Sequence, residues 1–180
     1  MKLVKGGPQK SPPSSCKKNK MRITTKFLIL LIIFVSITIW EKIQAAISIT
    51  VTGSWTQTID ASDLQAGAGS DLIDTYESAS DAVSIDISQT GGDWRVDVKK
   101  VDTNWHSNFQ LSVRRTSSGT GSGTISGGTS YQEVTDTDQS FFNGTKSRDG
   151  INVQLKLSGV SVQIPPDTYS TTVYYTVVDI

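Results

Sequence analysis

Apolar and polar residues alternate one by one along most of the chain after residue 46. A period of two places the apolar side chains on one face of an extended strand and the polar side chains on the other. The polar members are rich in Thr and Ser, which suit strands better than helices. The pattern predicts seven strands, at residues 47–51, 83–87, 94–98, 109–113, 151–157, 160–164 and 169–177.

Turn-forming residues separate these stretches. Thr90-Gly91-Gly92-Asp93 lies between two strands and is short enough to predict a hairpin. Arg148-Asp149-Gly150 offers a residue with positive φ before the next strand. Pro165-Pro166-Asp167 separates the last two strands, because proline cannot donate to a strand ladder. The Gly- and Ser-rich stretch Ser117–Ser130 is predicted to be a flexible loop.

These elements predict an all-β fold. Many short strands, each apolar on one face, are typical of an antiparallel sandwich or barrel. We favour an immunoglobulin-like sandwich of two sheets, because two sheets that bury their apolar faces against each other explain the alternation without a partner or cofactor. Only residues 60–80 have room for a short helix, around Asp60–Leu64 or Asp71–Tyr76.

Residues 1–45 have a different character. The apolar run Phe27–Trp40 follows a basic stretch and is itself followed by the small residue Ala45. This order is typical of a secretory signal peptide, with cleavage expected after Ala45. We therefore interpret residues 1–45 as a basic segment plus a signal helix, and residues 46–180 as one secreted domain. An uncleaved membrane anchor is the alternative, although spanning a bilayer takes about 20 apolar residues.

Charge separates the same two parts. The whole chain has 17 basic and 17 acidic residues. Residues 1–45 hold nine of the basic residues and one acid, for a net +8, so residues 46–180 carry a net −8. An acidic domain lacks the basic surface that nucleic-acid binding requires. Residues 1–20 are predicted to be disordered, and whether translation starts at Met1 or Met21 stays open.

The single cysteine, Cys16, lies upstream of the apolar run. The secreted domain therefore has no disulfide and must be held by its core or by a partner.

No motif of this chain requires a particular chemistry. The glycine-rich stretch Gly119–Gly128 lacks the following Lys and helix that phosphate binding needs, which favours a plain loop. His106 is the only histidine, no G-x-S-x-G sequence occurs, and one His without Cys makes a zinc site improbable. Nothing singles out a pair of catalytic carboxylates. We predict a non-enzymatic protein without catalytic residues, metal or cofactor.

Two kinds of ligand stay open as alternatives. Crowded acidic residues suit calcium, although their spacing is not that of an EF-hand; they are Asp60, Asp63, Asp71, Asp74, Asp136 and Asp138. Aromatic residues suit stacking against a sugar; they are Trp55, Trp94, Trp105, Phe141 and Phe142. Trp94 begins an alternating apolar set, so we expect it in the core instead.

The stretch Ile164–Ile180 holds a Pro-Pro-Asp turn, a Tyr and then alternating Thr and Val residues to the end. It resembles the C-terminal strand of secreted bacterial immunoglobulin-like modules, namely fimbrial subunits and spore-coat-U-like proteins. The alternation of Ile47, Ile49 and Val51 just after the leader is similar to the start of such subunits. Those subunits commonly carry a disulfide, whereas this domain has no cysteine.

The resemblance implies self-assembly, in which one subunit's sheet is completed by a strand of the next. Ala46–Gly53 would be the donated strand; the alternative, which we favour, is that it pairs within its own domain. We expect a secreted or cell-surface structural or adhesive protein, pilus-like or coat-like, that associates with itself or with another envelope protein. It would touch the membrane only through an uncleaved leader. The alternative function is a monomeric secreted module that binds carbohydrate or protein.

Overall fold

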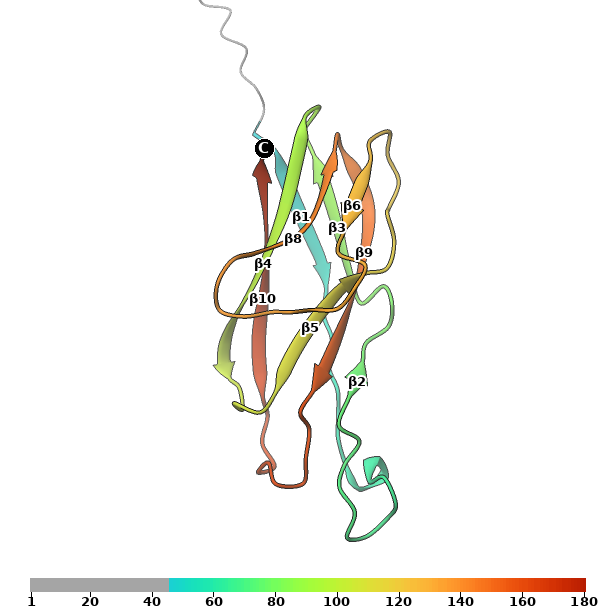
Figure 1. The fold of residues 1–180 in the computed structure, drawn as a ribbon, viewed down its shortest axis with the longest axis vertical. Coiled ribbons are helices and arrows are strands. Elements are labelled where there is room, and N and C mark those ends of the chain that lie inside the picture. The colour runs from blue at the N-terminus through green and yellow to red at the C-terminus, as the bar shows by residue number, and fades with distance from the viewer. Residues whose placement is uncertain (1–45) are drawn as a thin grey trace, which may run out of the picture. The chain divides into compact units, whose positions relative to one another are not determined.

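The computed structural model describes residues 46–180, in which nearly all the regular elements are strands, joined by turns and long loops (Figure 1). The predicted leader and signal helix, residues 1–45, lie outside the described residues. The elements are β1 Ser48–Gly53, η1 Ala61–Asp63, β2 Tyr76–Glu77, β3 Val83–Ser88, β4 Asp93–Asn104, β5 Gln110–Arg115, β6 Ile125–Gly127, β7 Gln132–Glu133, β8 Gln139–Thr145, β9 Arg148–Ser158 and β10 Ser170–Asp179. Among these residues no helix is long and apolar enough to cross a membrane.

The strands form two antiparallel sheets, which confirms the predicted all-β class. Sheet 1 has the order β1-β3-β9-β5-β7, with β2 paired to β9, and sheet 2 has the order β10-β4-β8-β6. Inner residues of both sheets share one core. The side on which β1 and β10 are the edge strands is here called the open side, and the side with β6 and β7 is called the closed side.

The core follows from the alternation read in the sequence. In β3, buried and half-buried residues alternate without a break. Full burial of an aliphatic side chain stabilises a fold by about 1.5–3 kcal/mol, so a set of such residues supplies the main driving force. The largest side chains that are fully buried are Trp94, Ile85, Ile87, Ile151, Val96, Val98, Val113, Val134 and Val153.

All the predicted strands but one are present, as β1, β3, β4, β5, β9 and β10. The prediction for residues 160–164 is wrong, because this segment is a turn. Asp71 explains the difference: its carboxylate accepts a hydrogen bond from the backbone N–H of Val162 (3.0 Å), which holds the chain away from any ladder. Val160 is buried, whereas Val162 is 55% exposed.

The hairpin predicted at Thr90–Asp93 is also wrong. β3 pairs with β1 and β9 in sheet 1, and β4 pairs with β10 and β8 in sheet 2. The turn therefore crosses between the sheets, and the N–H of Lys146 holds it by donating to the carbonyl of Gly92 (2.9 Å). Both strands bury an alternating face, so their patterns alone do not distinguish a hairpin from a crossover.

Strand β8 was not predicted. Phe141 and Phe142 follow each other within this strand and are both buried, which breaks the alternation of apolar and polar residues. The pairing of β4 with β8 shifts register between Val96 and Asp97, a β-bulge that turns two adjacent side chains toward the core. Of the two places considered for a short helix, Asp60–Leu64 contains a single 3₁₀ turn, Ala61–Asp63, and Asp71–Tyr76 contains no helix.

The glycine-rich stretch is held in place rather than being a free loop. It contains β6, which pairs with β8. Two buried arginines hold the rest: Arg115 donates to the carbonyls of Gly127 (3.0 Å) and Ser117 (3.1 Å). Arg148 donates to the carbonyls of Ser118, Gly123 and Gly119. The flexible-loop prediction missed these contacts because the arginines lie on other strands, β5 and β9.

Candidate functional site

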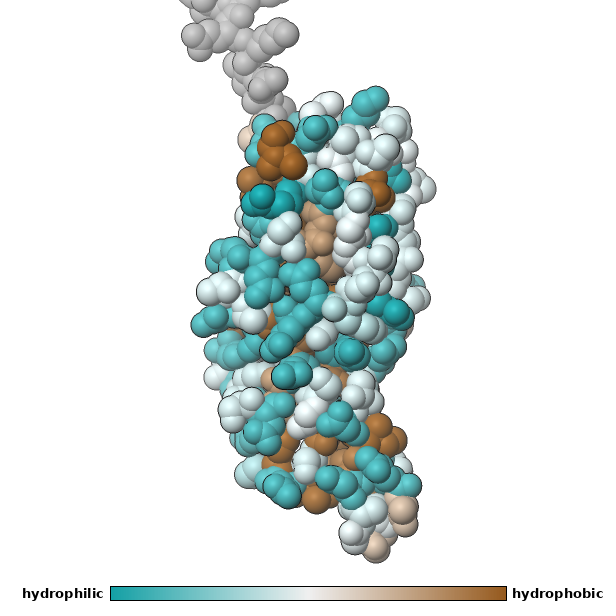
Figure 2. All heavy atoms as spheres, viewed as in Figure 1, coloured by the Kyte–Doolittle hydropathy of each residue, from teal (hydrophilic) through white to brown (hydrophobic). Residues whose placement is uncertain are grey.

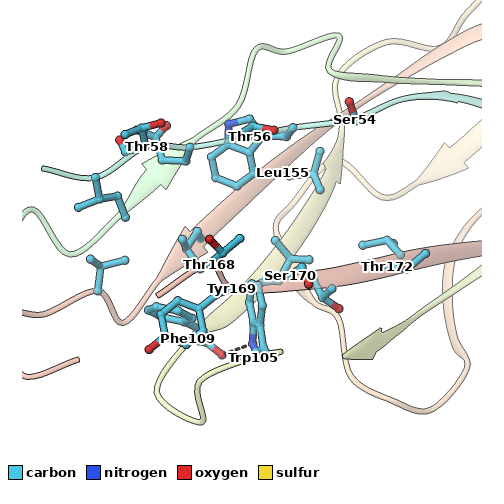
Figure 3. Close-up of a pocket in the computed structure, with 18 of the residues that line it drawn as sticks. Ser54, Thr56, Thr58, Trp105, Phe109, Leu155, Thr168, Tyr169, Ser170 and Thr172 are labelled. Atoms are coloured by element: carbon cyan, nitrogen blue, oxygen red, sulfur yellow. Dashed lines mark hydrogen bonds between the residues drawn. The ribbon is translucent and has the colours of Figure 1, made fainter. Parts of the chain in front are cut away.

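A groove of about 910 Å³ opens between the sheets on the open side (Figure 3). One wall is the extended segment Ser54–Ile59, which follows β1, and the other is Thr168–Val173, which includes the start of β10. The floor between them is apolar and comes mainly from sheet 1: Val83, Leu111, Leu155, Leu157 and Val160. Asp167 is the only charged residue among the lining residues. The groove thus suits an uncharged, extended ligand.

The first wall has no strand partner. β1 ends at Gly53, whose φ of +115° and close approach to the carbonyl of Ala82 exclude any side chain; an added Cβ would lie 2.1 Å from that oxygen. Beyond it, Ser54–Ile59 takes part in no backbone–backbone hydrogen bond with any residue of the described chain. Trp55 and Ile59 pack against Tyr76, Leu157 and Val160, while the residues between them are exposed.

The second wall has a free edge. β10 pairs only with β4, and Val173 lies opposite Lys100 in that ladder. The N–H of Lys100 donates to the carbonyl of Thr135 (2.8 Å), away from β10. In an antiparallel pair, two opposite residues either bond each other through their N–H and C=O groups or both point these groups outward. Because Lys100 points its N–H away from β10, the N–H and C=O groups of Val173 face the free edge. β10 also lacks the Lys and Pro residues that commonly protect sheet edges.

Aromatic rings close one end of the groove, and hydrogen bonds fix their positions. The indole N–H of Trp105 donates to the carbonyl of Phe109 (3.1 Å), and the hydroxyl of Tyr169 donates to the carbonyl of Pro165 (2.8 Å). The ring of Phe109 meets Trp105 and Tyr169 edge to face, with centroids 5.4 and 5.0 Å apart. We call Trp105, Phe109 and Tyr169 the aromatic end.

Tyr175 also lines the groove, and its hydroxyl is buried. That hydroxyl has no hydrogen-bond partner among residues 46–180. Burial raises the pKa of Tyr175 well above its ordinary value, because the ionised phenolate would lie away from water. The phenol is therefore neutral at physiological pH and adds no charge to the groove.

The structure separates the five aromatic residues that were considered for sugar stacking. Trp94 is in the core, as predicted, where its ring contacts Phe142 edge to face (6.1 Å). Phe141 and Phe142 are also buried in the core, so for them the stacking hypothesis is wrong. Trp55 and Trp105 are half-buried and line the groove.

Most of the crowded acidic residues make contacts within the domain that hold its loops in shape. Asp60 and Asp63 cap the 3₁₀ turn by accepting backbone N–H groups. The carboxylate of Asp74 accepts the N–H of Gly159 (3.2 Å), and that of Asp138 forms an ion pair with Lys99 (2.8 Å). Within residues 46–180, no group of three His, Cys, Asp or Glu residues is placed to hold a metal ion.

His106, which we interpreted as a loop residue, lies beside the aromatic end. Its Nδ1 accepts the backbone N–H of Asn108 (3.2 Å), and its ring contacts Phe109 and Tyr169. The hydrogen bond and the ring contacts fix the position of this side chain.

The groove was not predicted from the sequence, because its two walls are more than a hundred residues apart in the chain. The one signal that pointed to it was the long, uncharged C-terminal strand pattern. Comparisons with known proteins identify no relative: no family model, no curated protein and no solved structure matches this chain.

Proposed function

We propose that residues 46–180 are a non-enzymatic structural or adhesive subunit of a cell-surface assembly, pilus-like or coat-like, in which the groove receives a β-strand from a second copy. The observation that carries this proposal is the apolar groove between the unpaired outer edge of β10 and the segment Ser54–Ile59, which has no strand partner among the described residues. An extended peptide added to a sheet edge gains main-chain hydrogen bonds, and its alternate side chains fill pockets.

The order of the strands supports an immunoglobulin-like sandwich that lacks one strand. In immunoglobulin constant-type domains one sheet has the order A-B-E-D and the other has C-F-G. Here β1-β3-β9-β5 corresponds to the first sheet, and β4-β10 corresponds to C-F. No strand within residues 46–180 takes the place of G beside β10. We infer that the groove lies where that strand would pack.

Ala46–Gly53 has the chemistry of a strand that would fit. It is uncharged and apolar at every second position, through Ile47, Ile49 and Val51. In the structure this segment pairs with β3 of its own domain, which is the alternative that we favoured, with Val51 opposite Ile85. As a free peptide, it can serve as a probe for the strand that a second copy supplies.

Light scattering of purified residues 46–180 over a range of concentrations tests the proposal. Val173→Pro removes an N–H group that faces the free edge of β10 while leaving the ladder with β4 intact. We expect the unaltered domain to form concentration-dependent assemblies and Val173→Pro to remain monomeric. Val173→Ala is the matched control, because it loses the side chain but keeps the N–H, and it should still assemble. A strict monomer, or unimpaired assembly of Val173→Pro, contradicts the proposal.

A monomeric binding module is the second candidate, because Trp55 and Trp105 are accessible in the groove. Sugars stack on open ring faces, whereas the aromatic end packs its rings edge to face. This packing favours a peptide over a carbohydrate. A domain that stays monomeric and binds glycans on an array would establish the second candidate instead.

A further inference from the structure

We propose that the aromatic end is the subsite that selects the added strand: it takes one large apolar side chain and thereby decides which strand is accepted and in which register. This inference rests on the proposed function and names the residues that give it specificity. The occupant is an uncharged strand of a second copy, because the groove lining carries no charge except Asp167.

The subsite is formed before any ligand arrives. Trp105 and Tyr169 are each held by a hydrogen bond to a backbone carbonyl, and Phe109 is packed between their rings. All three side chains stay half-buried, so they remain accessible from the groove. Fixed side chains lose little conformational entropy on binding, which makes such a site a strong determinant of affinity.

The chemistry of the lining selects for size and for lack of charge. Leu157 and Trp55 border the same region of the groove. A charged side chain placed there would lose much of its hydration, and the one charged lining residue, Asp167, already accepts hydrogen bonds from the side-chain amide of Asn104 and the N–H of Thr168. A small side chain would leave the rings uncovered. A branched aliphatic or aromatic side chain fits both conditions.

Strand geometry allows only one residue of the ligand to reach the subsite. Inward-facing side chains of a strand repeat every second residue, at about 6.6–6.8 Å. Val173 and Tyr175 of β10 repeat with this spacing along the groove, and so do Ile47, Ile49 and Val51 of Ala46–Gly53. A strand added beside β10 therefore places successive apolar residues over successive floor positions, and one of them meets the aromatic end.

A double-mutant cycle with a synthetic peptide tests the inference. An acetylated, amidated peptide with the sequence of Ala46–Gly53 is titrated into residues 46–180 by calorimetry, beside peptides with Ala at position 47, 49 or 51. We expect one of the three replacements to weaken binding by about tenfold more than the others. In Trp105→Ala this excess loss should disappear, while the other two replacements keep their effect.

Tyr174→Ala is the matched control, because Tyr174 is an aromatic residue of β10 that is 48% exposed and does not line the groove. Its peptide affinities should equal those of the unaltered domain. Circular dichroism verifies each fold, and Phe109→Leu replaces Trp105→Ala if the latter unfolds. If the peptides bind but the effect of each Ala replacement is the same in Trp105→Ala or Phe109→Leu as in the unaltered domain, the subsite is overturned and the proposed function still stands. If the unaltered domain binds none of the peptides, both are overturned.

Discussion

The two sides of the sandwich differ in how completely their edges are covered. On the closed side the edge strands are short, three residues in β6 and two in β7, and the glycine-rich stretch that contains β6 is anchored by Arg115 and Arg148. On the open side β1 has six residues and β10 has ten, and no described strand pairs with their outer edges. Short, covered edges resist pairing with other chains, whereas long bare edges invite it.

The difference between a covered and an uncovered position is also visible in the burial of one cross-strand pair, Ile85 and Val51. Ile85 and Val51 lie opposite each other on the inner face of β3 and β1, yet Ile85 is fully buried and Val51 is 41% exposed. Both are branched aliphatic residues, so position accounts for the contrast: Val51 borders the groove, where no strand covers it. Figure 2 shows a mostly hydrophilic middle, with hydrophobic atoms near the upper end of the view and also toward the lower end, where the β9–β10 connection lies in Figure 1.

The largest expected effect comes from truncating that pair. Ile85→Ala should lower the free energy of unfolding by about 3 kcal/mol, because it leaves a cavity in a closed core. Val51→Ala should lower it by only about 0.5 kcal/mol, since much of its side chain already meets water. Urea denaturation of both variants measures the difference. Equal losses would show that the groove is closed in solution.

Arg148→Ala tests the anchoring of the closed side. It removes the donors to three carbonyl groups of the glycine-rich stretch, and we expect a loss of about 2–3 kcal/mol in the free energy of unfolding. Limited proteolysis should then cut within Ser117–Gly128. Arg95→Ala is the control, because Arg95 forms a partly exposed ion pair with Asp97 whose loss should cost below about 1 kcal/mol. Continued resistance of Arg148→Ala to protease would contradict the anchoring role.

Gly144→Ala examines the packing beneath the closed side. A Cβ there would lie 2.6 Å from the ring of Trp94 and 2.7 Å from the carbonyl of Thr124, so we expect a loss of about 2 kcal/mol from overpacking. Gly91→Ala is the matched control, since a Cβ at Gly91 meets nothing within 4 Å. Thermal unfolding of both variants measures the effect, and similar melting temperatures would refute the tight packing.

Tyr175→Phe tests whether the Tyr175 hydroxyl on the open side is buried away from water. Removing a buried hydroxyl that lacks a partner among residues 46–180 should raise the free energy of unfolding by about 1 kcal/mol. The pH dependence should change too. Burial raises the pKa of Tyr175 in the folded state, so the stability it supports is present below the ordinary tyrosine pKa of about 10 and is lost as the pH rises above it.

Urea titrations between pH 8 and about pH 11 should therefore show a smaller alkaline loss for Tyr175→Phe than for the unaltered domain. Part of the loss should remain, because burial also raises the pKa values of Tyr76 and Tyr131. An unchanged alkaline loss would mean that water reaches the Tyr175 hydroxyl.

The alternating pattern predicted most of the strands correctly because the two faces of a strand are visible in neighbouring residues. It failed where local residues do not decide the outcome. The turn at Thr90–Asp93 looks like a hairpin, and only the pairing of β3 with β9 shows that it is a crossover. Strand β8 was missed because a β-bulge turns the adjacent residues Phe141 and Phe142 both toward the core, and only the pairing with β4 shows that bulge.

The amino-acid sequence by itself determined the all-β class, the inward-facing residues and the lack of charge in β1. Tertiary structure decided which sheet each strand joined, which edges stayed unpaired, and hence where the groove opened. The physical reason is the distance along the chain over which each property is decided. Side-chain periodicity is set within a few residues, whereas pairing depends on contacts between distant segments, such as the hydrogen bond from the indole of Trp94 to the carbonyl of Lys146 (2.7 Å).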